Sequence, residues 1–406
     1  MAIPAWAQPP VGRRATRDRN PHGPLSRENG WLAAAVLAFA LYPFLDSWLN
    51  IGRVGSMEAI FVYVILAMGL NIVVGYAGLL DLGYAAFFAF GAYSVGLLTS
   101  PSSYFVQQGY VPGWLQHFWP ALAVSWMVAA VFGLLLGMPT LRLRGDYLAI
   151  VTLGFGEIVP NVFRNAEKFT NGVKGINPIA TPPTINVGSH AFRFTSGDQR
   201  HWYWLMMAVV LFSLIIIRRL YDSRLGRTWQ AIREDEIAAA SMGVNLVKTK
   251  LLAFALGASF AGFAGSVYSS AFQFVDSSQF QFSVSITVLS MIILGGLGNV
   301  YGAIIGAMII GGFDRILTEA LNPRLHWIGR QTHWNGLATH DLKQDRFLVF
   351  GLALVLMMLL RPGGIWQSSQ RKAELSPSTD DERIQESGSL DDVMRGHNEP
   401  GVGEKA

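Results

Sequence analysis

Ten long apolar segments, separated by shorter polar stretches, dominate the pattern of the chain. They cover residues 31–49, 59–75, 82–100, 118–139, 146–163, 202–219, 250–272, 283–299, 301–320 and 346–361. A helix that spans a bilayer needs about 20 mostly apolar residues, and these segments approach or reach that length. The pattern therefore predicts an all-α, polytopic membrane helix bundle with about ten transmembrane helices.

Charged residues are absent from two long parts of the chain. Residues 82–141 and residues 277–313 contain no Asp, Glu, Lys or Arg. A soluble domain would place charges along the exposed face of each amphipathic helix. Over the whole chain, 14% of residues are charged and 51% are hydrophobic, whereas soluble domains typically contain about 25% charged residues. These proportions exclude an ordinary soluble globular protein.

Small residues recur four positions apart within the apolar segments. The pairs are Gly133/Gly137, Ala258/Gly262 and Gly302/Gly306. Such pairs allow two helix backbones to approach closely in lipid. Glycine is also frequent in membrane helices generally, so the pattern is consistent both with close packing and with simple abundance.

The distribution of basic residues predicts the orientation of the bundle. Residues 1–30 contain five arginines against two acidic residues, and residues 218–250 contain seven basic residues. An even number of spans puts both segments on one side, which the positive-inside rule makes the cytoplasm. Residues 363–406 are rich in charge, Ser, Pro and Gly, a composition typical of disorder. We therefore expect a basic cytoplasmic N-terminal arm (1–30), a transmembrane domain (31–362) with a cytoplasmic loop (220–250), and a disordered cytoplasmic tail (363–406).

The motifs of common catalytic and cofactor sites are missing from the sequence. It contains no G-x-x-x-x-G-K-[ST] phosphate loop, no H-E-x-x-H zinc motif and no cysteine. The lack of cysteine excludes disulfides and thiolate metal sites. No basic stretch is interleaved with aromatic residues as in nucleic-acid-binding proteins. The sequence therefore predicts no enzymatic activity of its own, no catalytic residue, no cofactor, no metal and no nucleic-acid partner.

Glu157 is the ionisable residue set deepest within a predicted span. A charge inside the bilayer costs on the order of 2.5–3.5 kcal/mol on insertion scales, so its presence needs a reason. Gly154 and Gly156 precede it, and two glycines allow a helix to open so that its backbone lines a cavity. Glu157 is therefore a candidate for a pathway through the membrane. A buried, hydrogen-bonded structural carboxyl is the other interpretation.

A short cytoplasmic helix is predicted within the loop 220–250. It covers residues 228–242, with Thr228 as a candidate N-cap and Gly243 or Asn245 as the residue that ends it. The helix has a smooth face of small residues and a charged face, formed by residues 238–240 and 233–236 respectively. Such a helix suits a groove in a soluble partner, or it is a solvated connector.

Several motifs give the chain a resemblance to a known family. The segments 69–88, 140–154 and 294–299 look like signature segments of LivM-type permeases, and the match ends at Arg361-Pro362-Gly363-Gly364. Asp81 and Tyr84 stand where the family often has Ser and His. The pattern Glu236-x-Ala238-Ala239-x-x-x-Gly243 resembles the EAA loop of ABC importer permeases, with one residue inserted after the glutamate and without the usual Ile-x-Leu-Pro ending. Over about residues 59–362, the chain thus resembles the LivM-type permeases of the branched-chain amino acid ABC importer family.

This resemblance implies a permease subunit in the inner or plasma membrane of a bacterium, which translocates leucine, isoleucine and valine into the cell. The implied partners are a LivH-type permease in a heterodimer, two ABC ATPase subunits that hydrolyse the ATP, and an extracytoplasmic substrate-binding protein. The EAA loop implies that ATPase coupling involves Arg233, Glu236, Ala238, Ala239 and Gly243. The expected translocation pathway involves Asp81, Tyr84, Gly154, Gly156 and Glu157.

Two other functions remain compatible with the residues. Urea and short amides are substrates of related permeases. An ion-coupled secondary transporter needs coupling-ion or proton sites near the middle of the membrane, which only Glu157 and Asp314 supply. The cytoplasmic helix has no role in a secondary transporter, so co-purification with ATPase subunits distinguishes the two classes.

Overall fold

The computed structural model describes nine stretches of the chain and two single residues. They are 39–48, 52–140, 146–187, 190–192, 194, 199–317, 322–324, 326–327, 331, 345–361 and 363–366. The chain divides into two units, Met1–Gly52 and Arg53–Ala406. In the first unit, residues 39–48 are helical and overlap the predicted span 31–49. The second unit contains the remaining elements.

Helices make up nearly all regular structure in the described part of the second unit. The elements are α2 (Val54–Leu70), the π-helix η2 (Asn71–Tyr76), α3 (Tyr84–Thr99), α4 (Tyr104–Gln107), η3 (Gly113–Gln116), α5 (Phe118–Thr140), α6 (Asp146–Asn165), α7 (Glu167–Thr170), η4 (Gly172–Lys174), β1 (Ile185–Val187), β2 (His190–Phe192), α8 (Gln199–Tyr221), α9 (Arg224–Glu234), α10 (Glu236–Ser241), α11 (Leu246–Phe272), η5 (Ser277–Phe280), α12 (Phe282–Gly295), α13 (Val300–Gly312), η6 (Phe313–Leu317) and α16 (Arg346–Leu360). Strands β1 and β2 form a small antiparallel hairpin in which Ile185 pairs with Phe192. The prediction of a helical membrane protein is confirmed.

Four helices in the described residues are long and apolar enough to cross a membrane. They are Val54–Tyr76, Phe118–Thr140, Gln199–Tyr221 and Leu246–Phe272. A helix of 23 residues, the length of the first three, is about 35 Å long, which exceeds the roughly 30 Å of a bilayer's hydrocarbon core. The other predicted spans from residue 82 onward also coincide with helices, but these are shorter or less apolar. Helix α12, for example, has 14 residues.

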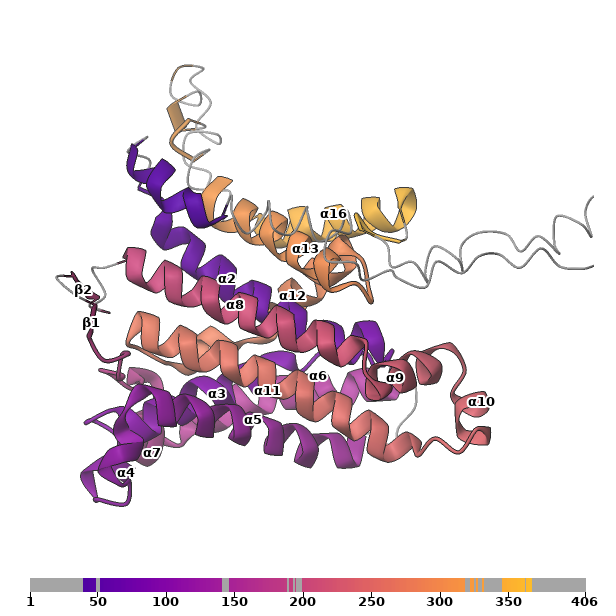
Figure 1. Ribbon diagram of the computed structural model, residues 1–406, viewed down its shortest axis with the longest axis horizontal. Helices are drawn as coiled ribbons and strands as arrows, with labels where there is room; N and C mark the ends of the chain where they lie inside the picture. The colour runs from indigo at the N-terminus through magenta and orange to yellow at the C-terminus, as the bar shows by residue number, and fades with distance from the viewer. Residues whose placement is uncertain are drawn as a thin grey trace, which may run out of the picture. The chain divides into compact units, whose positions relative to one another are not determined.

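Helix α11 lies in the centre of the packed helices, beside α2, α3 and α5 (Figure 1). Small residues allow this close approach, because a β-carbon at Gly91 would clash with the carbonyl oxygen of Gly262. The hydroxyl of Ser125 donates to the carbonyl of Gly91 over 2.8 Å and lies 2.6 Å from the hydroxyl of Ser266. Short polar side chains thus join α3, α5 and α11 where their backbones are closest.

The predicted small-residue pairs lie at helix contacts. A β-carbon at Gly133 would lie 2.6 Å from that of Ala258, so α5 and α11 meet there. A β-carbon at Gly302 would lie 2.6 Å from the carbonyl oxygen of Gly295, where α13 packs on α12. Close packing, rather than simple abundance of glycine, therefore accounts for these positions.

The two ends of the helices carry different structures (Figure 1). Helices α9 and α10 lie at one end, and α4, α7, β1 and β2 lie at the other. We call the first the α9–α10 end.

Of the predicted tail 363–406, the structure describes residues 363–366, where the Trp366 amide donates to the carbonyl of Gly295 over 2.9 Å. The start of that segment is therefore attached to the end of α12.

Candidate functional site

The predicted single helix 228–242 is wrong, because the segment forms two helices that meet at Asp235. This residue adopts an extended conformation, with φ −151° and ψ 109°, and ends α9. Its Oδ1 atom accepts hydrogen bonds from the amides of Ile237 and Ala238, at 2.8 and 2.9 Å. Asp235 is therefore the N-cap of α10. Aspartate is favoured at this position because its carboxylate accepts hydrogen bonds from backbone amides, which ends one helix and starts the next.

Helix α9 also begins earlier than predicted. Ser223 is its N-cap and accepts a hydrogen bond from the amide of Gly226. The predicted cap, Thr228, lies inside α9, where its hydroxyl donates to the carbonyl of Arg224. Trp229 is fully buried, and its indole Nε1 donates to the carbonyl of Thr249 over 2.8 Å. Helix α9 is thus held against the start of α11.

Helix α10 has one buried face and one exposed face. Ala239 is buried, with 5% of its surface exposed, and Glu236 pairs with the ammonium of Lys250 at 2.8 Å. Ala239 and Glu236 thus have contacts within the chain, and their contact with an ATPase subunit stays a prediction. Ile237 and Met242 project outward, with 79% and 86% of their surfaces exposed, and Ala238 is also exposed. The sequence interpretation missed Ile237 and Met242, because the break at Asp235 changes the phase of the helix.

Gly243 ends the helical segment as predicted. Its φ of +85° lies in the left-handed region, which a residue with a side chain rarely adopts. Asn245, two residues later, caps α11 by accepting a hydrogen bond from the amide of Lys248 at 3.0 Å. The chain therefore turns sharply from α10 into α11.

Arg233, predicted at the rim of a partner surface, reaches across to other helices of its own chain. Its guanidinium Nη1 donates a hydrogen bond to the carbonyl oxygen of Gly75, at the C-terminal end of η2. Helix ends carry unpaired carbonyls and a partial negative charge, and a cation there is favourable. A β-carbon at Gly78 or Gly298 would lie 2.9 or 2.8 Å from the Arg233 side chain, so the glycines make room for it.

The loop at Gly298 is joined to the same helix end. Its amide donates to Oδ1 of Asn71 over 3.0 Å, and Asn71 is fully buried at the start of η2. The π-helix η2 continues α2, and π-helical turns frequently occur at functional sites. Arg233 therefore links α9 to the end of α2 and to the turn between α12 and α13.

Asp81 and Tyr84, predicted along the pathway, are packed in the interior. Each has 1% of its surface exposed. The Asp81 Oδ1 atom accepts from the amide of Gly83 over 2.9 Å, and the Tyr84 hydroxyl donates to the carbonyl of Gly257 over 3.0 Å. The cavity beside Asp81 measures about 10 Å³, enough for about one water molecule and too small for an amino acid.

Helix α6 runs without a break through Gly154 and Gly156, so the expectation of an opened helix is wrong. Gly156 instead permits close packing, because its β-carbon would lie 3.1 Å from the Cα atom of Gly83. A β-carbon at Gly154 would meet no atom within 4 Å. Glu157 follows on the exposed side of α6, so it is not a buried structural carboxyl within this chain.

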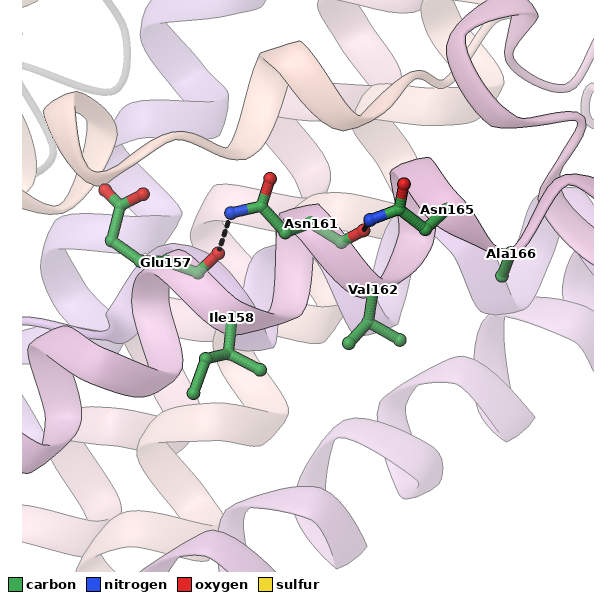
Figure 2. A pocket seen from close by; sticks show the side chains of 6 residues that line it. All are labelled: Glu157, Ile158, Asn161, Val162, Asn165 and Ala166. Carbon is green, nitrogen blue, oxygen red and sulfur yellow. Dashed lines mark hydrogen bonds between the residues drawn. The ribbon is translucent and has the colours of Figure 1, made fainter.

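A groove of about 510 Å³ lies along this exposed side (Figure 2). Its lining residues are Glu157, Ile158, Asn161, Val162, Asn165 and Ala166. The groove is open, because all of its lining residues belong to α6 or directly follow it. The sequence interpretation missed Asn161 and Asn165, although they follow Glu157 at successive intervals of four residues, which is a usable signal for one helix face. Asp81 and Tyr84 do not line this groove.

Metal-ligand clusters are not found in the part of the chain that the structure describes. No group of three or more His, Cys, Asp or Glu side chains there has the arrangement to hold a metal ion.

Comparison with known proteins assigns the chain to a family. The family described as "Branched-chain amino acid transport system / permease component" matches residues 53–360. The high-affinity branched-chain amino acid permease protein LivM of Escherichia coli is 34% identical over 369 residues, covering 87% of this chain and 78% of the relative. The probable LivM permease of Methanocaldococcus jannaschii is 23% identical over 337 residues, covering 75% and 90% respectively.

A second kind of permease is also similar. The LivH permease of E. coli is 24% identical over 327 residues, covering 79% of this chain and 95% of the relative. No solved structure matches the chain significantly. The family match covers most of the chain, and the first relative exceeds 30% identity over most of both proteins. The chain therefore belongs to the family of permease components of branched-chain amino acid transport systems.

Proposed function

We propose that the chain is one of two permease subunits of a bacterial ABC importer, and that it translocates leucine, isoleucine and valine across the inner membrane. Its partners are a LivH-type permease, two ATPase subunits and an extracytoplasmic substrate-binding protein. Membership of the family is the observation that supports branched-chain amino acids as the substrates. The exposed α10, which packs on α9 and α11, is the observation that supports an ATP-driven importer. ATP hydrolysis takes place on the ATPase subunits.

The membrane topology of the proposal has ten spans with both termini in the cytoplasm. Each of the ten predicted segments overlaps a helix, and the α9–α10 end carries Arg218, Arg219 and Arg224, as a cytoplasmic face does. We expect a reporter that is active only outside the cytoplasm to be silent when fused after Ala406. Strong activity of that fusion would refute the topology.

Helix α10 is the proposed docking element for the ATPase subunit. Ile237 and Met242 are exposed apolar side chains near the two ends of α10, and the Glu236–Lys250 ion pair joins α10 to α11. We call this outer surface, Ile237, Ala238 and Met242, the α10 knob.

Arg233 is the proposed route by which closure of the ATPase reaches the membrane. A shift of the α10 knob moves α9, and Arg233 passes that shift to the end of α2 through Gly75. The turn at Gly298 moves with it, because Asn71 ties it to η2. In this proposal, a displacement of α9 changes the relative positions of α2, α11 and the α12–α13 pair through these contacts.

Uptake in cells tests the function directly. A strain lacking this chain should lose most high-affinity uptake of labelled leucine, isoleucine and valine, and uptake of labelled urea should be unchanged. Loss of urea uptake alone would favour the permeases for urea and short amides. Uptake that persists without ATP and depends on an ion gradient would favour the secondary transporter.

A further inference from the structure

The exposed face of α6 differs in chemistry from that of its neighbour α5. The exposed side chains of α5 are uniformly apolar: Met127, Val131, Leu135 and Met138. Such a face is suited to lipid tails. The exposed face of α6 carries Glu157 near the middle of the helix, where contact of a carboxylate with lipid is unfavourable. This face of α6 therefore needs protein or water against it.

Three polar side chains form a row along this face. Glu157, Asn161 and Asn165 are four residues apart and project from the same side of α6 (Figure 2). We call them the α6 polar row. Ile158 and Val162 also line the groove, but they point away from the polar row, downward in Figure 2. The groove thus combines a polar row with a branched apolar wall.

Hydrogen bonds within the helix determine which atoms the row presents. The Nδ2 atom of Asn161 donates to the carbonyl of Glu157 over 2.8 Å, and that of Asn165 donates to the carbonyl of Asn161 over 2.9 Å. A carbonyl only accepts, so each amide must turn its nitrogen to the helix and its oxygen outward. The row therefore presents a carboxylate and two amide oxygens as hydrogen-bond acceptors, and each amide keeps one further N–H as a donor.

We infer that the α6 polar row is the part of the translocation pathway that holds the ammonium group of the amino acid, while Ile158 and Val162 contact its branched side chain. This inference rests on the proposed function and names the group of the substrate that this subunit recognises. Acceptors of this kind pair with an ammonium group and not with a carboxylate.

The second permease covers the opposite side of the pathway. The LivH relative is similar over 95% of its length, so a LivH-type partner has a counterpart of α6 that can face this one across a pseudo-two-fold axis. The partner then supplies donors for the substrate's carboxylate. In this chain, Arg164 is exposed in the last turn of α6, beside Asn165 in the sequence.

Charge variants at Glu157 test the assignment in the complete complex, reconstituted in proteoliposomes with saturating loaded binding protein. Glu157→Asp should retain most leucine uptake, Glu157→Gln should lower the maximum rate about tenfold through loss of a charged hydrogen bond, and Glu157→Lys should abolish it. ATPase subunits should co-purify with all three. Wild-type rates for Glu157→Lys would overturn the inference.

Thiol labelling tests the position of the row even if a charge variant fails to assemble, because the chain contains no cysteine of its own. Asn161→Cys should react with a charged, water-soluble thiol reagent in the assembled complex, whereas Val131→Cys on the apolar face of α5 should not. An unreactive Asn161→Cys would overturn the inference. Failure of the proposed function would appear differently, as a wild-type complex without ATP-dependent amino acid uptake.

Discussion

Replacement of both Ile237 and Met242 by glutamate is expected to detach the ATPase subunits and abolish ATP-driven uptake. These side chains are 79% and 86% exposed in the chain alone, so the variant leaves the permease's own packing intact. In the complex they would be buried, and each apolar side chain of this size contributes roughly 1.5–3 kcal/mol on burial. Their loss, together with two charges in an apolar groove, should weaken binding about a hundredfold or more. The measurement is co-purification of the ATPase subunits with a tagged permease.

The matched control is Leu225→Glu. Leu225 is an apolar residue on α9 with 36% of its surface exposed, and it lies outside the α10 knob. This variant introduces the same charge near the same end of the molecule and should retain the ATPase subunits. Equal retention by the control and by the double variant would rule out α10 as the docking element.

Substitution of Arg233 by glutamine is expected to separate ATP hydrolysis from uptake. The variant leaves the α10 knob unchanged, so the ATPase subunits should still co-purify. It removes the charged donor from the carbonyl of Gly75, a buried residue, at a cost of about 1–3 kcal/mol. Without that contact, movement of α9 no longer reaches the end of α2. We expect ATP hydrolysis to continue while leucine uptake falls at least tenfold.

Arg227 on the same helix provides the control. Its guanidinium donates to the carbonyl of Asp222 over 2.8 Å, in the loop that precedes α9. Arg227→Gln removes the same charge and should leave uptake near the wild-type rate. An Arg233→Gln permease that transports normally would show that the contact with Gly75 does not carry the coupling.

Long apolar helices were predictable from the sequence because the physical signal is local. The predicted span 118–139 and the observed helix Phe118–Thr140 agree closely, since nearly every residue in this interval favours an apolar helix. The interval 82–100 likewise corresponds to Tyr84–Thr99. The prediction of these two helices required no knowledge of which segments contact one another in the fold.

The site was only partly predictable. Asp235 was interpreted as part of a charged helical face, yet an aspartate equally suits an N-cap, and the choice depends on how α9 and α11 hold the chain. That break rotates α10, which buries Ala239 and exposes Ile237. The contact of Arg233 with Gly75 joins residues 158 positions apart. No local pattern contains such a contact.

On α6, in contrast to the Arg233 contact, a local pattern was present in the sequence. The spacing of Glu157, Asn161 and Asn165 was visible in the sequence, but only the structure distinguishes an exposed row from a buried one. The same applies to Asp81 and Tyr84, whose place in a family signature suggested the pathway and whose burial puts them in the packed interior.

Reconstitution of the purified complex tests the central claim most directly. Proteoliposomes that contain this chain, a LivH-type permease and the ATPase subunits should accumulate labelled leucine when ATP and loaded binding protein are supplied. Accumulation should stop when ATP is replaced by a non-hydrolysable analogue, whatever the ion gradient. Leucine accumulation driven by an ion gradient in liposomes that contain this chain without ATPase subunits would contradict the account.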